Sequence, residues 1–299
     1  MKKLVVGLGE VLWDMLPGQK HLGGAPANFA YITNLLGDKG IVASRVGTDD
    51  AGLEATGRIE ALGLPTTFLQ HDDHHRTGMV RVEVDDKGCA KFEIEAPSAW
   101  DFLEWTAEWR VLAERAEAVC FGSLAQRSTQ SRETIRRFLD ATRPEAVRIF
   151  DVNLREPFYS QDILADSMRL ADIVKMNDAE VPRVMELGGL GHVDEVSSAR
   201  RLIDLYDLKL VCVTRGSQGS LLVSRNDSHA QGGVGIKVAD TIGAGDAFTA
   251  TLTHEYLRGA SLERMNVVAN RVGAWVASEA GPTPTPKDGT LEHSLGETV

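Results

Sequence analysis

The segment 240–246 (Asp-Thr-Ile-Gly-Ala-Gly-Asp) runs directly into the apolar stretch 247–252. Two glycines and an alanine leave the backbone uncovered where this pattern predicts the start of a helix. The first N–H groups of a helix have no partner within the helix, and the helix dipole adds partial positive charge there. Such a turn can hold an anion, especially a phosphate group, and Asp246 would lie in the same first turn.

Asp246 is open to two interpretations. A carboxylate repels a phosphate group, so it does not suit a site that only stores phosphate. It does suit a site where the carboxylate takes a proton from a hydroxyl group that attacks the phosphorus. The alternative is an ordinary helix start in which Asp246 is a favourable acid of the first turn. The segment by itself does not decide between them.

A second group of candidate residues lies near the N-terminus. In the segment 23–30 (Gly-Gly-Ala-Pro-Ala-Asn-Phe-Ala), Pro26 suits the first turn of a helix that runs to Leu36. The Asn28 amide could bind the hydroxyl groups of a sugar, or it could cap the loop beside it. Asp14 follows the first predicted strand, where α/β proteins bind ligands. It could accept hydrogen bonds from two neighbouring hydroxyl groups, or it could be an exposed acid of a turn.

Three familiar sites are excluded or disfavoured. The segment 7–12 (Gly-Leu-Gly-Glu-Val-Leu) has leucine where a dinucleotide fingerprint needs its third glycine, and no helix pattern follows. The chain contains no Gly-x-x-x-x-Gly-Lys-Ser/Thr loop, so a P-loop kinase is excluded. The segment 72–76 (Asp-Asp-His-His-Arg) resembles a metal site, but no further ligands stand at usable spacing, which favours a solvated loop.

The elements that must position these residues alternate along the chain. Short apolar runs, typical of strands buried on both faces, occur at 4–8, 41–43, 118–121, 147–150, 172–174 and 210–213. Amphipathic stretches such as 131–142 and 196–206 lie between them and predict helices. The sequence therefore predicts an α/β fold with three layers, in which helices flank a mostly parallel sheet.

One region departs from this alternation and predicts a small β lid. Residues 78–84 and 90–95 alternate apolar and polar side chains, and 85–88 would turn the chain between them into an antiparallel hairpin. A second strand pair is expected from 11–16 and 66–70. The predicted core is then 1–10, 18–65 and 100–299, and the predicted lid is 11–17 and 66–99. The tail after Pro286 is polar and is expected to be mobile.

The composition limits the possible partners. Among 299 residues, 43% are hydrophobic and 25% charged, as in soluble globular proteins, and the net charge is -11. This charge argues against nucleic acid or an anionic membrane as a partner, so a nucleotide would be held by local donors and metal ions. No apolar run approaches the roughly 18 residues of a membrane span. Three cysteines without metal-type spacing indicate a reducing cytoplasm.

Taken together, the segments 23–28 and 240–246 resemble the two signatures of the ribokinase-like (PfkB) carbohydrate kinases. The resemblance extends from Gly9 to about Pro286 and includes the interrupted β lid. It implies an enzyme that transfers the γ-phosphoryl group of ATP to a hydroxyl group of a small sugar, with Mg²⁺ and in some relatives K⁺.

The resemblance also implies a role for individual residues. Asp246 would be the base, and the backbone N–H groups of Gly243, Ala244 and Gly245 would stabilise the transferring phosphoryl group. The remaining residues are expected to bind ligands: Asp14, Gly24 and Asn28 the sugar, Asn177 and Glu180 Mg²⁺ through water, Thr214, Gly216 and Gly219 the nucleotide, Asn270 adenine, and the carbonyl groups of Asp240 and Ile242 K⁺.

The sugar is suggested by two further segments. Residues 151–155 (Asp-Val-Asn-Leu-Arg) resemble the fructokinase and 2-keto-3-deoxygluconate kinase branches, where Arg155 would clamp a phosphate or a substrate carboxylate. An ordinary surface arginine is the alternative. Residues 23–28 and 121–125 read closest to bacterial fructokinases, and Gln126 is a candidate sugar ligand. We therefore expect phosphorylation of fructose at the 6-hydroxyl. The alternatives are ketodeoxygluconate kinase, another PfkB sugar kinase, or a sugar sensor without turnover. A homodimer through the lid is compatible with the resemblance.

Overall fold

The central element of the molecule is a large sheet. The computed structural model describes residues 2–16, 19–84, 90–191, 193–287 and 289–295. Within these residues the nine-stranded sheet has the order β13-β12-β11-β10-β9-β8-β1-β4-β5. Its strands are β1 (Leu4–Leu8), β4 (Lys39–Gly47), β5 (Leu69–Asp72), β8 (Ala118–Gly122), β9 (Val147–Asp151), β10 (Ile173–Asn177), β11 (Leu210–Thr214), β12 (Ser220–Ser224) and β13 (Ser228–Gln231).

The six predicted apolar runs all form strands of this sheet. In β1, Val6 and Leu8 pack into one hydrophobic cluster, and Val5 packs into a second. Because successive side chains of a strand point to opposite faces, the two clusters cover the two faces of the sheet. The strands from β11 to β5 are parallel, whereas β12 and β13 are antiparallel additions at one edge. The apolar-run pattern does not predict these two.

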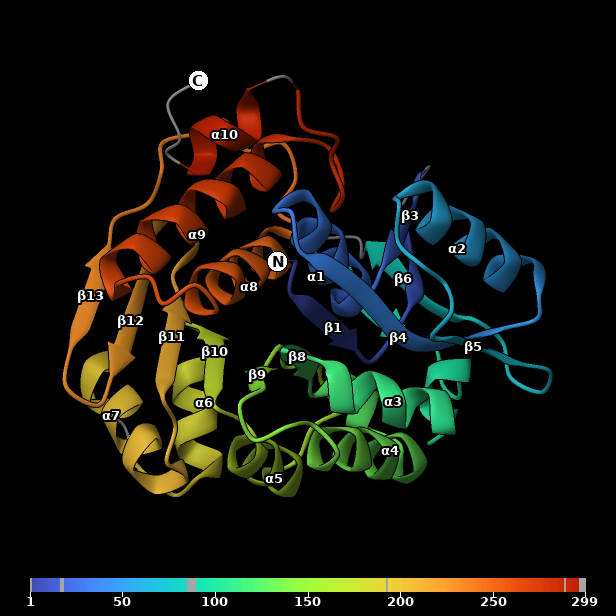
Figure 1. Ribbon diagram of the computed structural model, residues 1–299, viewed down its shortest axis with the longest axis horizontal. Helices are drawn as coiled ribbons and strands as arrows, with labels where there is room; N and C mark the ends of the chain where they lie inside the picture. The colour runs from blue at the N-terminus through green and yellow to red at the C-terminus, as the bar shows by residue number, and fades with distance from the viewer. Residues whose placement is uncertain (1, 17–18, 85–89, 192, 288, 296–299) are drawn as a thin grey trace.

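Helices cover both faces of the sheet, as Figure 1 shows. One layer contains α1 (Ala25–Leu35), α2 (Asp50–Ala61), α8 (Ala244–Tyr256), α9 (Leu262–Ser278) and α10 (Thr290–Leu295). The opposite layer contains α3 (Ala107–Arg115), α4 (Thr129–Asp140), α5 (Gln161–Leu170), α6 (Glu180–Leu187) and α7 (Glu195–Tyr206). The predicted three-layer α/β fold is therefore confirmed. Helix α10 contacts α9, so part of the tail after Pro286 packs on the core, contrary to the expectation of a mobile tail.

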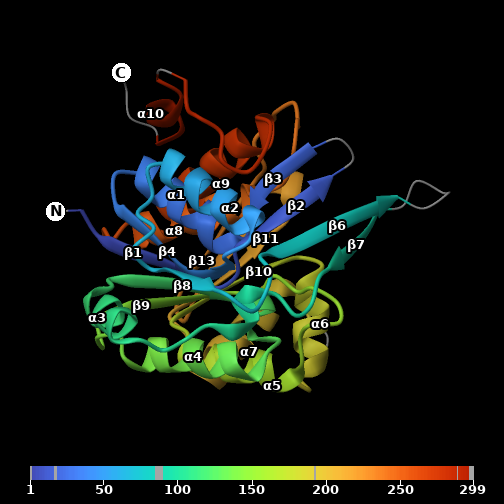
Figure 2. The ribbon, with the colours of Figure 1, turned by 90° about the vertical axis from the view of Figure 1, so that its right-hand side faces the viewer.

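The small sheet projects from one end of the molecule, as Figure 2 shows. Its order is β3-β2-β6-β7, with β2 (Leu12–Leu16), β3 (Gln19–Gly23), β6 (Gly78–Val84) and β7 (Ala90–Ile94). The predicted hairpin of β6 and β7 is confirmed, while its turn at 85–88 lies outside the described residues.

The expected pairing of 11–16 with 66–70 is wrong. Strand β2 pairs with β3 and β6, and β5 pairs with β4 of the large sheet. Residues 19–23 thus join the small sheet, and 69–72 join the large one. The choice of partner depends on register and packing across the chain, which strand patterns do not encode.

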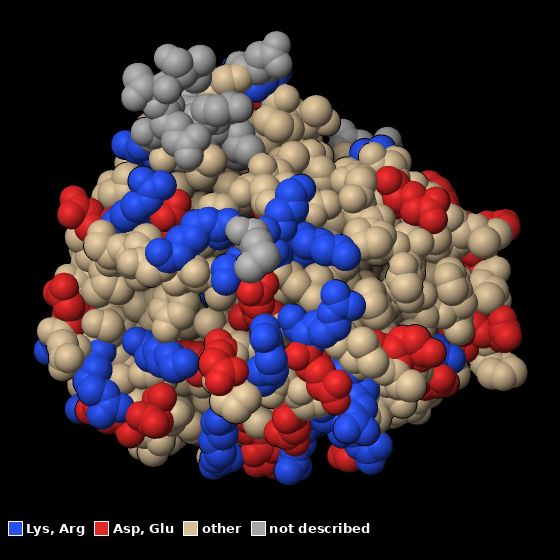
Figure 3. All heavy atoms as spheres, in the orientation of Figure 1, with Lys and Arg blue, Asp and Glu red and all other residues tan. Residues whose placement is uncertain are grey.

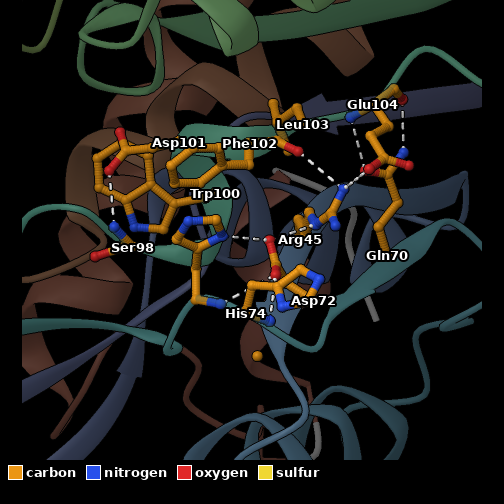
Figure 4. A network of polar contacts seen from close by, with 12 residues as sticks. Arg45, Gln70, Asp72, His74, Ser98, Trp100, Asp101, Phe102, Leu103 and Glu104 are labelled. Atoms are coloured by element: carbon orange, nitrogen blue, oxygen red, sulfur yellow. Dashed lines mark hydrogen bonds and ion pairs between the residues drawn. The ribbon is translucent and has the colours of Figure 1, made fainter.

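Polar contacts hold the chain between β5 of the large sheet and β6 of the small sheet, and Figure 4 shows those of Arg45 and Asp72. Asp72 is 2% exposed, forms an ion pair with Arg45 at 3.0 Å and is hydrogen-bonded to Nδ1 of His75 at 3.0 Å. The His75 ring stacks on Phe102 at 3.5 Å, and Thr77 donates to Asp49. The segment 72–76 is therefore not simply a solvated loop, because its first acid anchors the chain just before β6.

Candidate active site

The predicted anion-binding turn lies at the start of α8. This helix begins at Ala244, and its N-cap Gly243 has φ 78° and no side-chain hydrogen bond to the free N–H groups. A Cβ atom at position 243 would lie 2.6 Å from Cβ of Pro282. Both the left-handed backbone and the close contact therefore require glycine. The prediction of a helix start at this segment is confirmed, and the N–H group of Ala244 donates to the carbonyl oxygen of Thr241 at 3.3 Å.

Asp246 and Asn28 meet at this turn, although 218 positions separate them in the chain. Nδ2 of Asn28, on α1, donates to Oδ2 of Asp246 at 2.8 Å. The Asn28 side chain is 3% exposed, and its buried Oδ1 has no hydrogen-bond partner among the described residues. A buried amide oxygen without a partner is costly, so this atom fits a ligand that brings a donor such as a hydroxyl group.

The small sheet contributes Asp14 to the same site. Asp14 lies on β2 opposite His21 of β3, and its side chain covers Gly23, where a Cβ atom would collide with Oδ2. Gly24 has φ 101°, and a Cβ atom there would collide with the carbonyl oxygen of Glu10. Glycines at positions 23 and 24 thus let the chain pass between Asp14 and Asn28, the two residues predicted to bind the sugar.

Three acids of the site have raised pKa values. Burial raises the pKa of Asp246 to about 6, with Asp151 adding to the shift and Asn28 opposing it. Burial also raises the pKa of Asp14 to about 6 and that of Glu10 to about 7. The charge of Arg155 lowers the pKa of Glu10, Asp14 and Asp246. Perturbed acids gathered in this way are typical of functional sites.

Arg155 and Gln126 have different surroundings. Arg155 is exposed, and Nη1 donates to its neighbouring carbonyl at 2.9 Å, so its guanidinium group can still turn toward a ligand. Gln126 is 6% exposed, and its Nε2 already donates to Gly122 O and Ser167 Oγ at 2.8 Å each. Both protons of this amide are therefore in use, and only its oxygen could reach a sugar.

The two residues predicted to bind Mg²⁺ form reciprocal hydrogen bonds at the end of β10. Glu180 accepts hydrogen bonds from N–H of Asn177 at 2.8 Å and of Leu154 at 2.7 Å. Oδ1 of Asn177 in turn accepts from N–H of Glu180 at 2.9 Å. Since each of these oxygens already has a backbone donor, they fit a metal ion held through water better than one bound directly.

The predicted nucleotide residues lie along the ends of β11 and β12. Gly219 has φ 94° and packs against residues 231–233, which fixes the turn after Thr214, whereas a Cβ atom at Gly216 would meet open space. Nδ2 of Asn270, on α9, donates to Ser220 Oγ at 2.6 Å, so this amide also ties the helix to the sheet.

Asp240, a predicted K⁺ residue, shapes the loop before α8. Its two carboxylate oxygens accept from N–H of Ile242 at 3.0 Å and of Gly281 at 3.3 Å. The carboxylate therefore fixes the bend that leads to Gly243.

Three residues beneath the turn have no role in the predictions from the sequence, although Asp151 begins the segment 151–155. Lys175 of β10 lies with Nζ 3.1 Å from both carboxylate oxygens of Asp151, on β9. Thr249 of α8 donates to the same carboxylate at 3.0 Å. A lysine inside the apolar run of a buried parallel strand was the available signal, because lysine is rarely buried without a partner.

Acidic and basic side chains are mixed on one face of the molecule. On the face shown in Figure 3, Lys and Arg lie beside Asp and Glu. Such a face does not by itself attract phosphate groups, whereas a helix start such as that of α8 can bind them locally. No helix among the described residues is both long and apolar enough to cross a membrane.

Comparisons with known proteins identify the family. Residues 11–288 match the pfkB family of carbohydrate kinases, and the chain belongs to this family. A fructokinase from Escherichia coli is 31% identical over 260 residues, covering 82% of this chain and 81% of the relative. A sugar kinase from Pyrococcus horikoshii, solved in complex with ATP, is 27% identical with a TM-score of 0.82, covering 98% of this chain and 99% of that one.

A third relative has been solved with ligands. A double mutant of the fructokinase from Vibrio cholerae O395, with fructose, ADP and a potassium ion bound, is 27% identical with a TM-score of 0.82. The match covers 99% of this chain and 98% of that one. The fold, the site and these similarities together define the protein as a carbohydrate kinase.

Proposed function

We propose that this carbohydrate kinase transfers the γ-phosphoryl group of ATP to the 6-hydroxyl group of fructose, with Asp246 as the base. The observation that carries the proposal is the Asn28 amide. Its Nδ2 donates to Asp246, and its buried Oδ1 has no partner among the described residues. One amide can therefore bind one sugar hydroxyl group through its oxygen while its Nδ2 holds the carboxylate that takes the proton of the attacking hydroxyl group.

The backbone at the start of α8 and the side chain of Asp246 have separate roles in phosphoryl transfer. ATP, when bound, supplies the phosphoryl group. The backbone N–H groups of Gly243, Ala244 and Gly245 stabilise the negative charge on that group, and that of Ala244 must turn from the carbonyl oxygen of Thr241 to do so. Asp246 accepts the proton of the sugar hydroxyl as its oxygen attacks phosphorus. A pKa of about 6 leaves Asp246 ionised at neutral pH while keeping it a better proton acceptor than an ordinary aspartate.

The same proposal includes the metal ions. Asn177 and Glu180 would orient the water molecules of Mg²⁺, which supplies positive charge to the phosphate oxygens. The carbonyl groups of Asp240 and Ile242 are proposed to bind K⁺ behind the turn. The Vibrio cholerae fructokinase with bound potassium supports this second assignment.

The charge of the site favours a neutral sugar over a keto acid. Glu10, Asp14 and Asp246 approach the site from the loop after β1, from β2 and from α8. A substrate carboxylate would be repelled by these acids and attracted by Arg155 alone. Fructose avoids this repulsion, and its hydroxyl groups can donate to the acids and to Asn28.

An ADP-release assay across a panel of substrates tests the proposal. Fructose, 2-keto-3-deoxygluconate, ribose and adenosine are compared at equal concentration, with ATP alone as the control for hydrolysis. We expect the highest kcat/KM for fructose. Absence of fructose turnover would exclude this substrate. Binding of fructose without ADP release would favour the sugar sensor.

Two further assignments accompany the proposed function. The small sheet is proposed to form a homodimer contact, because its strands project away from the core. Light scattering of the wild-type protein would refute this if it gave the mass of one chain. A cytoplasmic location is proposed because Cys120 and Cys212 are free, buried thiols.

A further inference from the structure

A buried ion pair lies beneath the anion-binding turn. Lys175 and Asp151 are register partners on adjacent parallel strands, and their side chains are 9% and 5% exposed. Removing two charges from water costs several kcal/mol per ion, and a hydrophobic pair is often as stable. Such a pair is therefore weak evidence for stability.

The ion pair is connected directly to the turn. Thr249 Oγ1 donates to Asp151 and also lies 2.9 Å from the carbonyl oxygen of Gly245. A Cβ atom at Gly245 would lie 3.2 Å from Nζ of Lys175. The ammonium group is thus placed immediately behind the backbone of the predicted phosphate site, and Asp151 holds the first turn of α8 through Thr249.

Several charged groups act on Asp246 from the surrounding elements. Glu10 follows β1, Asp151 ends β9, Arg155 follows β9, and Lys175 lies on β10. Asp151 raises the pKa of Asp246, whereas Lys175 and Arg155 lower it. Asp246 raises the pKa of Glu10, and both acids raise the pKa of the nearby Cys120 thiol on β8. The two members of the ion pair therefore act on Asp246 in opposite directions.

We propose that Asp151 and Lys175 are positioning residues for phosphoryl transfer. Asp151 fixes the turn of α8 through Thr249, and Lys175 places a buried positive charge behind Gly245. This inference rests on the proposed function of the turn. In the poorly hydrated interior the ammonium group stabilises negative charge that gathers on the other side of the backbone. It needs no rearrangement when that charge arrives.

The pair also adds a source of positive charge near the phosphate site besides the helix start and the metal ions. No Walker-type lysine is present in the chain, yet a lysine reaches the turn from the sheet. Because it approaches from behind, it can act on the phosphoryl group without occupying the space of the ligand.

Three variants test the proposal: Lys175→Met, Asp151→Asn, and the double variant, which removes the pair without leaving a single buried charge. For each, kcat/KM is measured against pH with a sugar that the wild-type enzyme phosphorylates. That quantity reports the ionisation of the free enzyme. Since any substrate of the wild type serves, failure of fructose as a substrate is separate from failure of this inference.

The expected pH shifts have opposite signs. Lys175→Met exposes Asp246 to an unpaired Asp151, so the acid limb should move to higher pH by about one unit or more. Asp151→Asn should move it to lower pH. In the double variant the acid limb should stay near that of the wild type, while kcat falls at least about tenfold because Thr249 loses its charged acceptor and no ammonium group remains behind Gly245.

The inference would be overturned by shifts of the same sign or by the absence of any shift in the two single variants. It would also be overturned by wild-type kcat in the double variant. Thermal melting identifies a single variant that does not fold, and in that case kcat of the double variant decides. A residue pair needed only for folding would lower the amount of active enzyme without moving the acid limb.

Discussion

Replacement of Asp246 by asparagine should lower turnover and raise stability at the same time. The amide can keep the hydrogen bond with Asn28 by turning its oxygen toward Nδ2, so the geometry of the site survives. The variant loses the proton acceptor, and kcat should fall by about 10²- to 10⁴-fold. That corresponds to about 3–5 kcal/mol of activation free energy.

The stability effect follows from the raised pKa. Folding raises the pKa of Asp246 from 3.8 to about 6, so the folded protein favours the protonated form. Its contribution to stability is full below about pH 4 and is lost as the pH rises through about 6. At pH 8 the ionised acid therefore costs at most about 3 kcal/mol, which the neutral asparagine does not.

Urea unfolding at pH 8 and pH 4, together with the ADP-release assay, measures both effects. The variant should unfold at a higher urea concentration than the wild type at pH 8, and this advantage should disappear near pH 4. Asp162→Asn is a matched control, because Asp162 is an exposed acid in the first turn of α5. It should leave kcat unchanged. Retention of more than a tenth of wild-type turnover in Asp246→Asn, or lower stability at pH 8, would refute the reasoning.

Three other changes probe the turn and its partner. Gly245→Val should lower kcat/KM for ATP by about 10²-fold, because its side chain would press against Nζ of Lys175 and displace the turn that binds phosphate; unchanged ATP kinetics would contradict this. Asn28→Ala should raise the KM of the sugar and lower kcat, each by about tenfold or more, since it removes a donor to Asp246; changes within twofold would remove Asn28 from the site. Gly243→Ala should lower the free energy of unfolding by about 1–3 kcal/mol, because its φ is 78° and Pro282 lies in the way. A urea midpoint equal to that of the wild type would disprove this last prediction.

Local patterns in the sequence predicted the elements that depend on local physics. The apolar runs formed the buried strands of the large sheet, and the alternating segments formed the hairpin of β6 and β7. The bare glycine turn began α8, and Pro26 entered the first turn of α1. Each of these outcomes is set by backbone sterics, unsatisfied N–H groups and side-chain periodicity within a few residues.

The pairing of distant segments was decided only by the tertiary structure. Strand patterns did not show that β2 pairs with β3 and β6, or that β5 joins the large sheet, because register is fixed by packing against other elements. The same reason hid Lys175 and Asp151, which adjacent strands bring together beneath α8. The sequence by itself determined a helix start that can hold a phosphate and an acid beside it. Only the folded chain placed Asn28 next to that acid and a buried positive charge behind the turn. Charges interact across space, with a strength that depends on burial, so their positions along the chain do not reveal these contacts.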